Sequence, residues 1–217
     1  MMQFILNRKS GQPLTLLCLG AHSDDIEIGC GGTILRLATE HPGSVFHWVV
    51  FSATGAREPE ARRGSELFTA GGRVESLRLG SFRDGFMPFE GAAVKDFFEE
   101  LKGKVNPDIV FTHNRNDAHQ DHRLLSELTW NTFRNHLILE YEIPKYDGDM
   151  GRPNVFVPLS AEQCQQKVHH VMETFASQRS KPWFDEQTFL GLMRLRGMEC
   201  NAPSGYAEAY YGHKVIL

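Results

Sequence analysis

Short apolar runs alternate with longer amphipathic segments along the first two thirds of the chain. Such alternation is typical of a mostly parallel β-sheet covered by helices. The apolar runs predict strands at 14–20, 45–52, 74–79, 108–112 and 137–143. Helical spacing of apolar residues predicts helices between them, at 26–40, 58–70, 94–104 and 122–135. We therefore expect a doubly wound, Rossmann-like α/β fold with helices on both faces of the sheet.

The pattern changes after Pro144. Residues 147–153 form a loop by composition, and a short strand is expected at 155–157. Ser160 and Gln163 have the spacing of a capping box, which predicts a helix to about residue 175. A further helix is expected at 187–198, and the chain ends in a short apolar run. We expect one domain over residues 1–217, with a core at 14–144 and a C-terminal α+β cap at 145–217.

Composition and charge limit the classes of partner. A content of 41% hydrophobic and 23% charged residues is that of an ordinary soluble globular protein. The formal charge of -4 gives no basic face for nucleic acid. The four cysteines have no zinc-ribbon spacing and are typical of reduced thiols. The N-terminus is too polar for a signal peptide, and the first apolar run is too short to span a bilayer. We expect a cytoplasmic protein with no nucleic-acid partner and no membrane anchor.

Histidine and carboxylate residues are concentrated in two short clusters, Ala21-His22-Ser23-Asp24-Asp25 and Asp117-Ala118-His119-Gln120-Asp121-His122. In each cluster a histidine is followed three positions later by a second metal-competent residue, Asp25 after His22 and His122 after His119. Side chains three residues apart in a helical turn lie on one side of the backbone. The clusters follow the first and fourth predicted strands, which are often neighbours where strand order reverses in doubly wound sheets. The two clusters can therefore share one site.

These clusters predict an open metal site. Helix capping by Asp24 or Asp25 explains only one aspartate, and a helix dipole explains only Asp121. Two imidazoles and a carboxylate would bind one zinc and leave a position for water, as in catalytic sites. Ferrous iron or another divalent ion would also suit these ligands. The spacing favours Asp25 as a ligand, which leaves Asp24 free to act as a base.

Glycines 29, 31 and 32 do not predict a dinucleotide site. They depart from the G-x-G-x-x-G spacing, and the two neighbouring carboxylates of Asp24 and Asp25 would repel a pyrophosphate. We expect these glycines to allow close packing of the first helix on the sheet.

The two clusters resemble the motifs of the PIG-L/LmbE-like family of metal-dependent N-deacetylases. The family motif A-H-P-D-D is matched with serine at Ser23 in place of proline, and D-x-H-x-D-H is matched at 117–122. The loop after the second strand departs from the family, because it has Thr54-Gly55-Ala56-Arg57-Glu58 where Gly-Glu is frequent. The resemblance implies that His22, Asp25 and His122 are the metal ligands and that Asp24 is the general base. It also implies that His119 is a second catalytic residue, oriented by Asp121.

The expected function is that of a zinc-dependent hydrolase that removes an acetyl group from an N-acetylated amino sugar or its conjugate. A protonated His119 would stabilise the oxyanion. Arg57 is the candidate for binding a phosphate or carboxylate of the substrate, and Asp117 would support a ligand. Two alternatives stay open: a metal-dependent phosphoesterase, which commonly uses two metals, and a non-catalytic sugar- or nucleotide-sugar-binding module with a structural metal. The sequence also leaves a homo-oligomer open.

Overall fold

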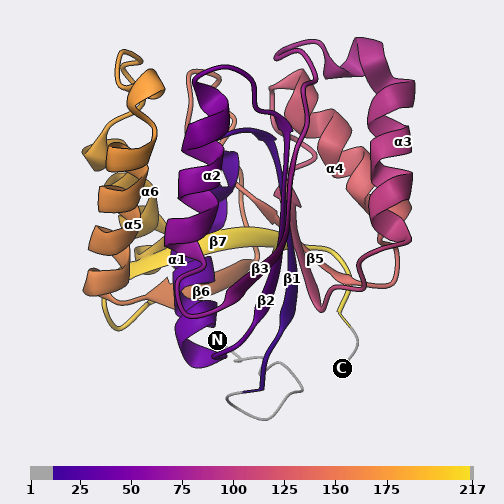
Figure 1. Cartoon of the computed structure of the whole chain (residues 1–217). Coiled ribbons are helices and arrows are strands. Elements are labelled where there is room, and N and C mark those ends of the chain that lie inside the picture. Colours follow the sequence, from indigo (N-terminus) through magenta and orange to yellow (C-terminus); the bar gives the residue numbers. More distant parts are fainter. Residues whose placement is uncertain (1–11, 216–217) are drawn as a thin grey trace.

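The computed structural model describes residues 12–215 and has a single seven-stranded sheet with strand order β3-β2-β1-β4-β5-β7-β6 (Figure 1). The strands are β1 Thr15–His22, β2 Val45–Ser52, β3 Arg73–Leu79, β4 Ile109–His113, β5 Leu137–Tyr141, β6 Val155–Leu159 and β7 Tyr206–Gly212. The first five strands pair in parallel, whereas β7 is antiparallel to both β5 and β6. The expected mostly parallel α/β sheet is therefore confirmed.

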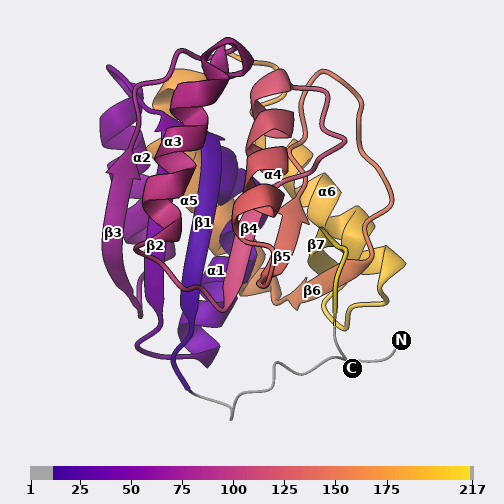
Figure 2. The same ribbon diagram turned by 90° about the vertical axis from the view of Figure 1, so that its right-hand side faces the viewer.

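In the described part of the chain, six α-helices cover the two faces of the sheet. They are α1 Asp25–Glu40, α2 Arg57–Phe68, α3 Gly91–Lys102, α4 Gln120–Thr132, α5 Ala161–Thr174 and α6 Glu186–Glu199. Figure 2 shows α3 and α4 in front of the sheet, with the other four helices behind it. Two short 3-10 helices, η1 Met87–Glu90 and η2 Ala176–Gln178, lie in connections.

The position of β1 between two layers of helices explains why its sequence is a continuous apolar run. Leu16 and Cys18 belong to the core under α1, α2, α5 and α6, whereas Leu17 and Leu19 belong to the core under α3 and α4. Successive side chains of a strand point to opposite faces, so a strand covered on both faces needs apolar residues throughout.

The C-terminal part of the chain continues the sheet, because β7 lies between β5 and β6. The sequence pattern indicated only a short apolar run there. Glu208 lies in the middle of β7 and is buried; it accepts hydrogen bonds from the backbone N of Gly32 and Thr33 and pairs with Lys167. A buried, fully paired carboxylate interrupts the apolar pattern of a strand without interrupting the strand itself.

The topology brings the two sequence clusters together. Strand β1 lies between β2 and β4, which is the point where strand order reverses, and both clusters follow the carboxyl ends of these neighbouring strands. Helix α1 packs closely here because Gly29 has no side chain: a Cβ would lie 2.2 Å from the Tyr141 ring.

The four cysteines are free, and three of them are buried. Within residues 12–215, none of the helices combines the length and the apolar character needed to cross a membrane.

Candidate metal centre

Three side chains approach one another at the carboxyl end of the sheet: His22 at the end of β1, Asp25 at the start of α1 and His122 in the first turn of α4. Nδ1 of His22 is 3.3 Å from Oδ2 of Asp25 and 3.2 Å from Nε2 of His122. Nε2 of His122 is 3.6 Å from Oδ1 of Asp25. Ligands about 2.1 Å from a tetrahedral zinc are about 3.4 Å apart. The closest donor pairs of these side chains therefore have the chemistry and the spacing of metal ligands, with the two histidines facing different oxygens of Asp25.

The second nitrogen of each of these two histidines faces a carboxylate. Nδ1 of His122 is 2.9 Å from Oδ2 of Asp117, and Nε2 of His22 is 3.3 Å from Oδ2 of Asp121 and 3.0 Å from Oδ1 of Asp84. A carboxylate on the far nitrogen fixes the tautomer and orientation of a metal-binding imidazole. Both rings are therefore held with the other nitrogen toward the shared point.

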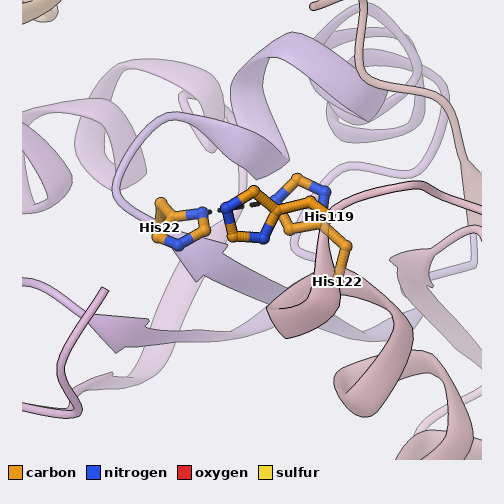
Figure 3. A group of neighbouring side chains, drawn as sticks. All are labelled: His22, His119 and His122. Atoms are coloured by element: carbon orange, nitrogen blue, oxygen red, sulfur yellow. Dashed lines mark hydrogen bonds between the residues drawn. The ribbon is translucent and has the colours of Figure 1, made fainter. Parts of the chain in front are cut away.

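His119 lies beside these rings but is held in another way (Figure 3). It is the N-cap of α4, and its Nδ1 accepts a hydrogen bond of 3.3 Å from the backbone N of Asp121. The Asp121 carboxylate instead contacts His22 and accepts from the backbone N of Gly85 and Met87. The hydrogen bond between these two residues is therefore made by the main chain of Asp121, and not by the carboxylate that was expected to orient His119.

The protonation of His119 also differs from the expectation. Burial and the nearby His22 lower the pKa of His119, so the ring is neutral near pH 7. Since its Nδ1 accepts a hydrogen bond, the neutral ring carries its proton on Nε2. His119 is thus a neutral donor, not a cation.

Asp24 is buried beside the converging donors and is engaged by one cation. Its Oδ1 accepts a hydrogen bond of 2.5 Å from Nη2 of Arg57. Burial raises the pKa of Asp24, although the Arg57 guanidinium opposes that effect. Arg57 also binds Glu60 at 3.2 Å and the hydroxyl of Ser177 at 3.0 Å. The residue expected to contact the substrate is therefore engaged by three groups of the protein.

Comparison with known proteins identifies the family. The model of the PIG-L family, described as GlcNAc-PI de-N-acetylase, matches residues 17–133. The chain belongs to this family. The match includes both clusters and more than half of the chain, so the resemblance seen in the sequence and the enzyme class, an N-deacetylase, are confirmed.

The individual relatives and solved structures have low sequence identity to this PIG-L protein. It is 28% identical over 152 residues to the "Uncharacterized deacetylase YaiS" of Escherichia coli (strain K12), which covers 64% of this chain and 76% of YaiS. It is similar in structure to N,N'-diacetylchitobiose deacetylase from Pyrococcus horikoshii, with a TM-score of 0.69, 19% identity and coverage of 94% and 84% of the two chains.

One structural neighbour has a different activity. The 4-carboxy-2-hydroxymuconate hydratase GalB from Pseudomonas putida KT2440 has a TM-score of 0.66 and 19% identity, with coverage of 94% of this chain and 98% of GalB. The fold therefore serves more than one reaction, and the enzyme class of this PIG-L protein rests on the family match.

Sequence reasoning missed His113 as part of the site. This last residue of β4 places Nε2 3.3 Å from Oδ2 of Asp25, and its ring stacks on His122 at 3.9 Å. Burial alone would raise the pKa of Asp25, but His122, His113 and His22 hold that pKa well below its usual value. Burial and His113 lower the pKa of His122 to about 4. Asp25 is thus anionic and His122 neutral, the states that bind a metal.

Asp84 also joins the site, from the loop between β3 and η1. Its side chain is 73% exposed, and its hydrogen bond to His22 lowers the pKa of Asp84 to about 2. A lone histidine in a strand and a lone aspartate in a loop have no spacing that indicates a shared site. The only signal for either was the predicted position at the carboxyl edge of the sheet.

Proposed function

We propose that this protein is a zinc-dependent hydrolase that removes the acetyl group from an N-acetylated amino sugar or its conjugate, with release of a free amine and acetate. The observation that carries the proposal is the convergence of the donor atoms of His22, Asp25 and His122, with Asp24 beside them. Two nitrogens and one oxygen suit zinc and leave a position open. Zinc, when bound, supplies Lewis acidity and lowers the pKa of water.

We assign to Asp24 the transfer of a proton from the attacking water. A deprotonated Asp24 accepts a proton from the attacking water, which makes the water nucleophilic. Arg57 binds Oδ1 of this carboxylate, and we assign the proton to Oδ2. Because Asp24 is adjacent to Asp25 in the chain, the base lies next to a metal ligand without serving as one.

His119 is assigned the stabilisation of the oxyanion. Its Nε2–H is oriented by the contact of Nδ1 with the backbone N of Asp121, and a fixed donor at a developing oxyanion lowers the barrier. A neutral imidazole gives up its remaining proton with difficulty. We therefore assign protonation of the leaving amine to Asp24, which returns the proton taken from water as the C–N bond breaks.

The substrate is proposed to be a small N-acetylated sugar or a sugar conjugate. The description of the family as GlcNAc-PI de-N-acetylase and the similarity in fold to a diacetylchitobiose deacetylase support this class. Free, mostly buried thiols support a reducing compartment such as the cytoplasm.

The test is amine release from N-acetylglucosamine, N,N'-diacetylchitobiose and a nucleotide-linked N-acetylglucosamine, with and without chelator. We expect one zinc per chain, and activity that a chelator removes and zinc restores. Asp24→Asn should keep the metal and lose turnover by about 10²-fold or more, whereas Asp96→Asn, at an exposed position of α3, should change neither. Chelator-resistant activity, or full turnover in Asp24→Asn, would overturn the proposal. Two metals per chain with phosphate release from an ester would favour a phosphoesterase.

A further inference from the structure

Lys145 is a lysine of intermediate burial outside both metal motifs, in the loop between β5 and β6. Its Nζ lies 3.0 Å from Oδ1 of Asp117 and 2.6 Å from Oδ2 of Asp149, and its side chain is 9% exposed. Lysine is almost never buried unless it is paired. Without Lys145, two carboxylates would remain close together with no cation between them. The lysine therefore has a defined position between Asp117 and Asp149.

Asp117 connects Lys145 to His122. Oδ1 of Asp117 forms an ion pair with Lys145 and, at 2.8 Å, accepts a hydrogen bond from the backbone N of His119. Oδ2 faces Nδ1 of His122 at 2.9 Å. Both carboxylate oxygens are occupied, so the group is held in one orientation. Because a carboxylate on the far nitrogen sets the orientation of a metal-binding imidazole, the contacts that fix Asp117 also fix His122.

Asp149 makes a second contact between the same loop and the turn that contains Asp117. Its Oδ2 accepts a hydrogen bond of 2.6 Å from the backbone N of Ala118, next to Asp117 in the chain. Gly148 has φ +62, which turns the chain so that Asp149 meets Lys145 four residues earlier. The loop and the turn that carries Asp117 are therefore joined by two independent contacts.

We propose that Lys145 is a positioning residue for the metal ligand His122, acting through Asp117, and that loop 144–153 is coupled to metal binding. The inference rests on the metal site of the proposed function. Lys145 holds the carboxylate that holds the imidazole, and Asp149 holds Lys145. Coupling between a ligand and a structural element is reciprocal in free energy. If the ordered loop increases metal affinity, bound metal should stabilise the ordered loop by the same free energy.

Zinc affinity of the full chain tests the first half of the proposal. Protein stripped of metal is titrated with zinc in competition with a chromophoric chelator. Lys145→Met should weaken binding by about tenfold, the lower end of the effect of losing an outer partner of a ligand. Lys145→Arg keeps the charge and should retain most of the affinity. Lys102→Met, at an exposed site on α3, is the matched control and should bind as the wild type does. Equal zinc affinity in Lys145→Met and the wild type would overturn the proposal.

Hydrogen exchange tests the coupling. Zinc should slow exchange of the backbone amides in loop 144–153 of the wild type and Lys145→Arg, but not of Lys145→Met. Equal protection by zinc in Lys145→Met contradicts the coupling. If Lys145→Met does not fold, Asp149→Asn removes the charge paired with Lys145 at nearly constant size, and should shift affinity and protection in the same direction. A folded Asp149→Asn protein with wild-type affinity and protection would overturn the proposal.

Both measurements use zinc alone and no substrate, so they separate this inference from the proposed reaction. A wild type that binds zinc but releases no amine contradicts the proposed reaction and leaves the role of Lys145 standing. A wild type that binds no zinc overturns both.

Discussion

Arg57 donates a hydrogen bond to Asp24 across 2.5 Å and thereby joins the start of α2 to the start of α1. The guanidinium favours the charged form of Asp24, whereas burial favours the neutral form. Glu60 and Ser177 hold Arg57 in this position. Arg57 is therefore placed to control the carboxylate proposed as the base.

Arg57→Gln should move the acidic limb of the kcat/KM profile to higher pH. Asp24 must be deprotonated to accept a proton, and loss of the guanidinium raises its pKa, so activity is lost first at low pH. Loss of a charged hydrogen bond predicts a decrease in kcat of about 10-fold to 100-fold. Arg62→Gln, whose exposed side chain pairs with Glu58, is the control. A large rise in KM with an unchanged kcat would instead identify Arg57 as a substrate contact.

His119→Gln should retain zinc and lose about 10²-fold to 10³-fold in kcat, because a donor to the oxyanion is removed or displaced. The neutral state of the ring gives a second expectation, that the basic limb of the pH profile stays in place. Rate measurements from pH 5 to pH 10, with metal content determined in parallel, check both. Loss of the basic limb in the variant would show that a protonated His119 takes part.

His113→Phe should destabilise the protein and weaken its metal site. The backbone N of Ala21 donates to Nε2 of His113 across 2.9 Å, and phenylalanine leaves that buried donor unpaired, which costs about 1–3 kcal/mol. The ring can still stack on His122, so the effect on zinc affinity reports the lost contact with Asp25. Chemical unfolding of the apoprotein and zinc competition measure the two effects. His169→Phe, on the exposed face of α5, should change neither.

Zinc should raise the unfolding temperature of the wild type, since a ligand that binds only the folded state stabilises it. The gain is about 4 kcal/mol at a free concentration of 1,000 Kd. His122→Ala removes a proposed ligand and should lose most of this shift, as seen by differential scanning calorimetry. A shift of wild-type size in this variant would exclude His122 from the ligand set.

Spacing and topology together predicted much of this site. The interval of three between His22 and Asp25 and the placement of the second cluster after a neighbouring strand predicted that the two clusters meet, whereas the choice of His122 as a ligand came from the family resemblance. The hydrogen-bond partners of the imidazole rings were harder to predict from the sequence. A carboxylate can face any nearby donor, and only the packing of the folded chain decides which one it meets. Asp121 accordingly contacts His22, which lies 99 positions away in the sequence, and not His119. Strand β7 was not predicted because the charged residue Glu208 interrupts its apolar pattern. The strand tolerates this buried charge because groups of α1 and α5 pair with it in the folded chain.

Ser177 connects the C-terminal segment to the carboxylate proposed as the base, through Arg57. The hydroxyl donates to Glu60 and accepts from Arg57, which in turn holds Asp24. The family match ends at residue 133, yet the side chain that binds the proposed base is held by a residue beyond it. A chimera that combined this core with the C-terminal segment of a relative would therefore have to recreate this contact before it could work.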